Sequence, residues 1–351
     1  MLLYIHIPFC DSKCFYCAFN SYTTQHYLKE SYIKSLKLEL KEKLKMHNKQ
    51  IETIFIGGGT PSCIDAIKYK EILDIIKPYI KTDIEITIEA NPNSASLDWL
   101  KTIYSIGVNR VSFGVQSFDN DKLKFLGRNH NKQNALDAIL NANKVGFNHI
   151  NLDIIYDTKL DTKELLENDL KIIKTLQIDH ISAYSLTIEE GTKFFNKSNV
   201  KIENINLANY LFEQLKDLGF EQYEISNFAK NKDARSKHNL GYWQYKEYLG
   251  IGCGAVGRVG NKRYYGFKDI LEYNNKYFEY EEIEELSKED ILIEKVLLGF
   301  RSDVGVDINL LNKSQQDKIY ELIDINKVMI QDNRVINLDF MLADELSLYI
   351  F

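Results

Sequence analysis

Six short apolar runs are the first regular feature of the chain. They cover residues 2–7, 53–56, 84–89, 110–115, 150–155 and 180–186, and polar or glycine-containing segments bound each of them. Runs of this length, rich in isoleucine and valine, are typical of strands buried on both faces. We therefore expect six strands in the first part of the chain.

Between these runs, apolar residues recur at helical spacing, most clearly over 27–44, 65–76 and 131–145. In the first stretch, Tyr32, Leu36 and Leu40 fall on one face of a helix. Strand and helix units in series predict a parallel sheet covered by helices. Such a sheet curls into a partial barrel when it has six of the eight strands of a closed one. We predict an α/β fold, a partial (β/α)6 barrel over 1–200, with functional side chains at the carboxyl ends of its strands.

The pattern changes after residue 200. A helix-like stretch at 207–218, a strand-like segment at 223–228 and a tyrosine-rich segment at 264–280 predict an extension over 201–280. The acidic run at 279–286 marks a boundary. Beyond it, two helix-like stretches and a hairpin-like segment at 328–338 predict a small α+β appendage over 281–351, of winged-helix type.

Composition narrows the class of protein. The chain has 351 residues, 44% hydrophobic and 27% charged, which suits one large domain with a smaller one. No apolar run approaches the ~18 residues of a membrane span, and the first strand begins at the N-terminus without a targeting pattern. The net charge of −6 argues against a nucleic-acid partner. We expect a cytoplasmic protein without a transmembrane segment.

Cys10, Cys14 and Cys17 form a C-x3-C-x2-C loop directly after the first strand. Three thiolates on one short loop can hold three corners of a [4Fe-4S] cluster and leave the fourth iron open. Two alternatives remain at this stage: a zinc site completed by His6 or His26, and a redox dithiol formed by Cys14 and Cys17. The dithiol leaves Cys10 unexplained.

This spacing resembles that of the radical S-adenosylmethionine (SAM) superfamily, whose open iron binds the amino and carboxylate groups of SAM. A second feature supports the resemblance: the second strand runs into Gly57, Gly58 and Gly59, followed by TPS. Glycines let the backbone approach a ligand closely. The resemblance implies that Gly58, Gly59 and Thr60 contact the amino group of SAM.

Further motifs extend the resemblance along most of the chain. YIHIPFC, GGGTPS, EANP, FGVQSF, LGRNH and NLD occur in the order found in coproporphyrinogen-oxidase-like radical SAM proteins, followed by AYSLTIEEGT, YEISNFA, HNLGYW and YLGIGCGA. Polar residues in or beside these motifs fall where that family carries SAM-binding residues. The resemblance thus implies that SAM is bound by Tyr4, Glu89, Gln116, Arg128 and Asp153 as well.

Two branches of that family must be separated. The oxygen-independent coproporphyrinogen III dehydrogenases carry a fourth cysteine two residues after the third, and Phe19 stands there in this chain. CAFNS and HNLGYW instead resemble the heme-chaperone branch. This branch implies heme as cargo, respiratory proteins as recipients, and His238 as an axial heme ligand. The open alternatives are the dehydrogenase, which would be an enzyme, and an iron-sulfur protein without SAM chemistry.

Two segments depart from the family pattern. Residues 157–162 read DTKLDT where relatives have a turn close to GLPGQT. Val256 and Gly257 stand where relatives commonly have histidine and serine. The first departure lies beside the expected cofactor site, so it makes radical chemistry less secure than cluster binding.

Overall fold

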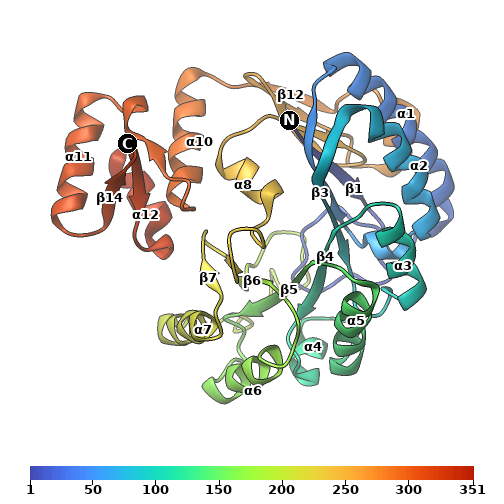
Figure 1. The fold of residues 1–351 in the computed structure, drawn as a ribbon, viewed down its shortest axis with the longest axis horizontal. Helices are drawn as coiled ribbons and strands as arrows, with labels where there is room; N and C mark the ends of the chain where they lie inside the picture. The colour runs from blue at the N-terminus through green and yellow to red at the C-terminus, as the bar shows by residue number, and fades with distance from the viewer.

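The computed structural model describes residues 1–351 and contains the predicted parallel sheet (Figure 1). Strands β1 to β6 lie side by side in chain order and are all parallel. Their bounds are Leu2–Ile7, Ile51–Gly58, Ile80–Ala90, Arg110–Gln116, His149–Tyr156 and His180–Ser185. The six predicted strands and the α/β class are confirmed.

Helices line the outer face of this sheet (Figure 1). They are α1 Lys29–His47, α2 Ala66–Ile76, α3 Leu97–Ser105, α4 Asn120–Phe125, α5 Lys132–Val145 and α6 Lys163–Ile173. Side chains at their N-caps explain where several begin: Asp65 accepts a hydrogen bond from the amide of Ile67, and Asn131 forms a capping box with Asn134. The apolar faces of strands and helices meet in one core of 57 buried residues.

The extension lengthens the sheet at both of its edges. Its elements are α7 Ile205–Asp217, β7 Glu221–Gln222, β8 Asn227–Ala229, α8 Lys237–Trp243, β9 Tyr248–Ile251, β10 Val256–Val259, β11 Lys262–Tyr265, α9 Ile270–Lys276 and β12 Glu282–Glu285. The sheet has twelve strands in the order β12-β11-β10-β9-β1-β2-β3-β4-β5-β6-β8-β7. Strand β9 pairs in parallel with β1, whereas β8 pairs antiparallel with β6. The sheet therefore continues through β12, beyond residue 280.

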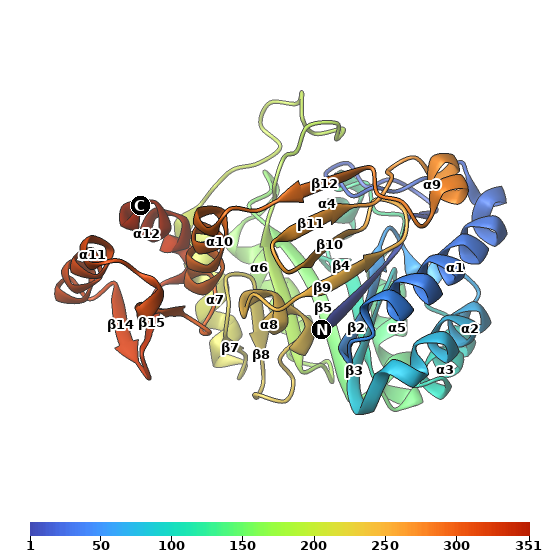
Figure 2. The same cartoon turned by 90° about the horizontal axis from the view of Figure 1, so that it is seen from above.

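The last part of the chain has a core of its own, with 11 buried residues between Val296 and Ile350. It comprises α10 Lys288–Phe300, β13 Val306–Asp307, α11 Lys313–Asp324, β14 Val328–Gln331, β15 Arg334–Asn337 and α12 Ala343–Ile350. Strands β14 and β15 form the expected hairpin. Seen from above, α10 lies beside the strands β9 to β12 (Figure 2).

Five short 3-10 helices complete the secondary structure: His26–Leu28, Pro61–Cys63, Lys77–Tyr79, Ile308–Leu310 and Phe340–Leu342. None of the helices is both long and apolar enough to span a bilayer.

Candidate cofactor site

The loop that follows β1 brings the three cysteines to one cavity. We call it the cluster cavity; its volume is about 450 Å³, and Cys10, Cys14 and Cys17 all line it. Backbone hydrogen bonds fix the loop, from the amide of Cys10 to the carbonyl of Tyr22 (3.0 Å) and from Phe15 to Leu126 (3.0 Å). The cysteines thus meet where the sequence predicts functional groups, beyond the carboxyl end of a parallel strand.

Donors from other strands face two of the sulfur atoms. The hydroxyl of Thr60 donates to Sγ of Cys10 at 3.3 Å, and Nη1 of Arg128 donates to Sγ of Cys14 at 3.2 Å. Burial raises the pKa of the Cys10 thiol, an effect that the Thr60 hydrogen bond opposes. Such donors favour the thiolate form, which is the form that binds iron.

Three cysteines that line one cavity meet the ligand requirement of a [4Fe-4S] cluster with one open iron. No three His, Cys, Asp or Glu side chains converge as ligands of a single metal ion would. A cubane does not need such convergence, because each thiolate binds a different iron. The two histidines considered for a zinc site make other contacts: Nε2 of His6 bonds to the carbonyl of Asn20 at 2.8 Å, and Nε2 of His26 to that of Cys10 at 3.1 Å.

The glycine run lets the end of β2 pack against the cysteine loop. A Cβ atom on Gly59 would lie 2.8 Å from the carbonyl oxygen of Phe9 and 3.1 Å from Sγ of Cys10. Gly58 has φ +111° and donates its amide to Oε2 of Glu89 at 3.0 Å. Both glycines and Thr60 line the cluster cavity. A larger residue at Gly59 would therefore push the loop away from the strand end, and one at Gly58 would collide with the ring of His6 on β1 at 2.5 Å.

Two carboxylates line the same cavity: Glu89 near the end of β3 and Asp153 on β5, with β4 between the two strands. Burial, together with the charge of Asp153, raises the pKa of Glu89 to about 8. Burial also raises the pKa of Asp153 to about 6, opposed by hydrogen bonds that include one from Asn151 at 2.7 Å. A cationic ligand group between them would remove this cost, because it would pair with the ionised forms.

Arg128 and Gln116 complete the cavity wall. Nη2 of Arg128 donates to Oδ1 of Asn91 at 2.7 Å and to the carbonyl of Gly114 at 2.5 Å, so the guanidinium is held in place before any ligand arrives. Gln116 adopts φ 70°, a left-handed conformation that non-glycine residues rarely take and that often marks functional sites. Both residues line the cavity with the cysteines.

The structure thus brings together ten of the residues expected from the sequence: Cys10, Cys14, Cys17, Gly58, Gly59, Thr60, Glu89, Gln116, Arg128 and Asp153. It also adds lining residues that sequence reasoning missed, including Tyr16, Asn91, Ser112 and Tyr184. Asn91 carried a usable signal, because it follows Glu89 within the EANP motif at the end of a strand.

Tyr4 and His238 lie outside the cluster cavity. Tyr4 lines a different cavity and its hydroxyl is hydrogen-bonded to Nδ1 of His6 at 2.9 Å. His238 is only 1% exposed. Its two ring nitrogens are occupied by the hydroxyls of Thr53 (2.8 Å) and Tyr242 (3.0 Å). In this conformation His238 has no nitrogen free for an iron atom.

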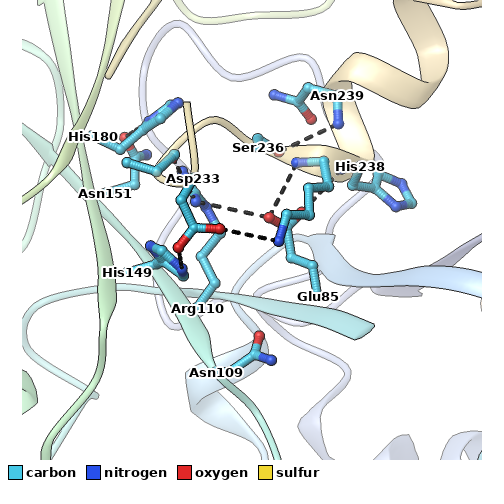
Figure 3. Close-up of polar contacts among 12 residues, drawn as sticks. Glu85, Asn109, Arg110, His149, Asn151, His180, Asp233, Ser236, His238 and Asn239 are labelled. Atoms are coloured by element: carbon cyan, nitrogen blue, oxygen red, sulfur yellow. Dashed lines mark hydrogen bonds and ion pairs between the residues drawn. The ribbon is translucent and has the colours of Figure 1, made fainter. Parts of the chain in front are cut away.

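Helix α8, which carries His238, is anchored to the sheet through a buried carboxylate (Figure 3). Glu85 on β3 accepts hydrogen bonds from the backbone amides of Lys237 (3.1 Å) and His238 (2.9 Å). Arg110 lies 3.8 Å from the same carboxylate and balances its charge. A carboxylate at a helix N-terminus satisfies amides that have no partner within the helix.

The divergent turn at 157–162 is stabilised by side chains in place of glycine and proline. Asp157 takes φ 63° and accepts hydrogen bonds from the hydroxyl of Ser185 (2.7 Å) and the amide of Asn204 (3.2 Å). Asp161 forms a buried ion pair with Lys122 at 2.5 Å. The turn is therefore ordered without its usual glycines. At the other departure, Gly257 allows β10 to approach β9 closely: a Cβ there would lie 2.8 Å from the amide of Gly250.

The fold and the three-cysteine loop define a radical SAM protein, and residues 4–173 match the family model described as "Radical SAM superfamily". Among curated proteins, heme chaperone HemW of Bacillus subtilis is 35% identical, over 86% of this chain and 84% of its own length. HemW of Lactococcus lactis is 32% identical, over 95% and 92%. The chain belongs to the HemW family. The resemblance to this branch, expected from CAFNS and HNLGYW, is confirmed.

The fold is also that of a solved enzyme. Coproporphyrinogen III oxidase (HemN) of Escherichia coli superimposes with a TM-score of 0.83, covering 99% of this chain and 89% of the enzyme. The sequence identity is 18%, so this likeness concerns the fold alone.

Proposed function

We propose that this protein is a heme chaperone that holds a [4Fe-4S] cluster with SAM at its open iron. The carrying observation is the 35% identity to heme chaperone HemW over 84% of that protein, combined with three cysteines around one cavity. On this proposal the protein binds heme and delivers it to recipient proteins, respiratory ones in particular, in the cytoplasm. Heme is then the cargo, whereas the cluster and SAM are resident cofactors.

The residues around the cluster cavity have separate roles in this proposal. Cys10, Cys14 and Cys17 hold the cluster. Gly58, Gly59 and Thr60 bind the amino group of SAM with their backbone and hydroxyl groups. Glu89, Gln116, Arg128 and Asp153 bind the rest of SAM through charge and hydrogen bonds. When bound, a reduced cluster supplies an electron that can cleave SAM.

Tyr4 and His238 have different roles from the residues above, because neither lines the cluster cavity. Tyr4 does not line the cluster cavity, so we assign it a supporting role in SAM binding. His238 would serve as an axial heme ligand only if it gave up its hydrogen bond to Thr53 or to Tyr242. A changed ligand spectrum of the bound heme in His238→Ala, at equal cluster content, would support ligation.

The second candidate function is the oxidative decarboxylation of coproporphyrinogen III, favoured by the TM-score of 0.83 to HemN. Against it stands Phe19, which occupies the position of the dehydrogenases' fourth cysteine and is 68% exposed. An iron-sulfur protein without SAM chemistry is the third candidate. Each makes a different prediction for the same sample.

The test is anaerobic reconstitution with iron and sulfide, followed by three measurements on one preparation. Heme titration, SAM-induced change in the cluster's spectrum, and conversion of coproporphyrinogen III to vinyl-containing product are recorded. Heme uptake at one equivalent without porphyrin turnover supports the chaperone. Turnover makes the protein an enzyme and overturns the proposal. A cluster that responds to neither SAM nor heme supports the third candidate.

A further inference from the structure

A second large cavity lies on the other side of the cysteine loop. Its volume is about 790 Å³. Segments far apart in sequence form its walls: β1, the end of the cysteine loop, the region from α8 through β11, and α10 of the C-terminal part. Figure 2 shows α10 lying beside the β9–β11 strands that make the opposite wall. We call it the tyrosine cavity.

Aromatic rings dominate one wall of the tyrosine cavity. Tyr242 and Tyr248 pack edge to face with their ring centroids 4.8 Å apart, and Tyr4 and Tyr245 also line the space. Leu297 and Leu298 of α10 contribute apolar surface. Broad aromatic and aliphatic surface of this kind suits a large, flat, apolar ligand.

The cationic side chains around this cavity differ in the hydrogen bonds and ion pairs that they already form. Arg258 donates to the backbone carbonyls of Tyr245 (2.7 Å) and Lys246 (2.9 Å), so its charge supports the wall. Arg263 is paired with Glu284 and Glu294. Lys268, by contrast, forms no ion pair, and Lys246 is exposed and pairs with Glu52, itself 46% exposed. Lys268 is thus available to an anionic ligand, and Lys246 can exchange its weak, exposed pair with Glu52 for one.

We infer that the tyrosine cavity binds the heme, with the porphyrin face against the tyrosine wall and its two carboxylates meeting Lys246 and Lys268. This inference rests on the proposed chaperone function, since it names the place of the cargo. The chemistry of the wall and rim matches an apolar macrocycle with two negative charges. The tyrosine cavity also contains Glu294, but that carboxylate is paired with Arg263. The cluster cavity matches less well, because Glu89 and Asp153 line it and form no ion pair.

This site gives His238 a different role from ligation. It is a positioning residue: buried against Phe55, with ring centroids 5.2 Å apart, it fixes the hydroxyl of Tyr242 from behind the tyrosine wall. Ala18 and Phe19 line both cavities. The heme therefore lies next to the loop that carries the cluster ligands, separated from the cluster cavity by the side of that loop.

The experiment introduces a side chain that can coordinate heme iron into the tyrosine cavity. Val256 lines the tyrosine cavity, so Val256→His places an imidazole there without removing any group that the proposal needs. Hemin is titrated into reconstituted full-length wild type and Val256→His, and the Soret and visible bands are compared. We expect the variant's bound heme to show a new imidazole-ligated spectrum. An unchanged spectrum in a variant that binds one equivalent would overturn the site.

Charge reversal tests whether Lys246 and Lys268, at the rim of the tyrosine cavity, bind the heme carboxylates. Lys246→Glu combined with Lys268→Glu should weaken hemin binding roughly tenfold, because two exposed attractions become repulsions. Hemin dimethyl ester, whose carboxylates are capped, should bind the double variant and wild type equally. Lys262→Glu is the matched control, an exposed lysine on β11 that does not line the cavity. Equal losses in the control and the double variant would show a non-specific charge effect and refute the rim assignment.

These outcomes separate the two proposals. If wild-type protein binds no hemin, the chaperone function itself fails. If wild type binds hemin while all cavity variants bind it with the same spectrum and affinity, the function stands and the site is elsewhere. The cluster's absorbance and the melting temperature of each variant verify that loop and fold are intact.

Discussion

The two cavities on either side of the cysteine loop are built in opposite ways. The cluster cavity is lined by residues at the ends of parallel strands, with polar donors aimed at thiols and a pair of buried carboxylates. The tyrosine cavity lies at a seam between the sheet's added strands and α10, and is lined by rings and exposed cations. The cluster cavity is lined by residues of the (β/α) core alone, whereas the tyrosine cavity also needs the additions to that core. On our proposals, the first cavity takes the cofactors and the second takes the cargo.

Removing a cluster ligand should have the largest effect and should separate the roles of the two cavities most clearly. We expect Cys14→Ser to lose the cluster's visible absorbance and most of its bound iron, because only three protein thiolates are available. Hemin uptake should persist, since Cys14 does not line the tyrosine cavity. Cys63→Ser is the control: that thiol donates to the carbonyl of Phe9 and should leave iron content unchanged. Joint loss of cluster and heme would show that the cavities are not independent.

The second largest effect is expected from a substitution of His238, which connects α8 to the sheet. His238→Ala removes a buried ring and leaves Thr53 and Tyr242 without a partner, which should lower the free energy of unfolding by about 2–3 kcal/mol. Denaturant unfolding measures this change. His47→Ala, at the exposed end of α1, serves as the control.

Heme binding by the same variant decides what His238 does. A positioning role predicts weaker hemin binding with an unchanged ligand spectrum. An axial role predicts a changed spectrum at equal cluster content, and that result would contradict the placement of His238 behind the tyrosine wall.

The carboxylates of the cluster cavity should give a pH-dependent effect of intermediate size. The pKa of Glu89 is raised from 4.5 to about 8, so the folded chain retains a proton that the unfolded chain releases earlier. Stability therefore falls as pH rises from about 4.5 to about 8. Glu89→Gln should flatten this fall and gain about 1 kcal/mol near pH 8, because the partial exposure of Glu89 reduces the full effect.

SAM binding should move in the opposite direction. Glu89→Gln is expected to weaken SAM binding roughly tenfold, because a charged hydrogen-bond acceptor is lost. Thermal melts across pH and SAM titrations of the reconstituted protein measure the two effects. Higher stability together with unchanged SAM affinity would remove Glu89 from the SAM site.

The smallest effect is expected at Phe19, one of the two residues that line both cavities. Phe19→Cys restores the fourth cysteine of the dehydrogenase pattern at an exposed position. We expect less than about twofold change in hemin affinity, since one exposed ring is lost among several aromatic contacts. No coproporphyrinogen turnover should appear, and a porphyrin assay measures it. Turnover in the variant alone would make Phe19 the discriminator between chaperone and enzyme.

Much of the cofactor site was predictable because its residues sit beside elements with strong local signals. A parallel strand buried on both faces reads as an apolar run, and its carboxyl end is where the sequence changes to polar or glycine residues. Glu89, Gln116 and Asp153 lie on such strands and were assigned through the resemblance of the motifs around them, and the cysteine spacing identified the loop. The bounds of β1 agreed with the sequence pattern to the residue.

The tyrosine cavity had no comparable signal. The antiparallel strands β9 to β12 are four residues long each, and nothing in the sequence indicates that β9 pairs with β1, some 240 residues earlier. Tyr4 was assigned to SAM by resemblance, yet it lines the tyrosine cavity and its hydroxyl bonds to His6. His238 was considered a heme ligand, because a histidine beside aromatic residues looks the same whether it is buried or free.

The sequence by itself therefore determined the (β/α)6 core, the cysteine loop and the polar groups at its strand ends, because each depends on neighbours close in the chain. Only the tertiary structure decided which side chains share a cavity, which histidine nitrogens are free and where a second site exists. Those properties depend on long-range strand pairing and on burial, and side-chain periodicity along one element carries no information about the partner that will cover it.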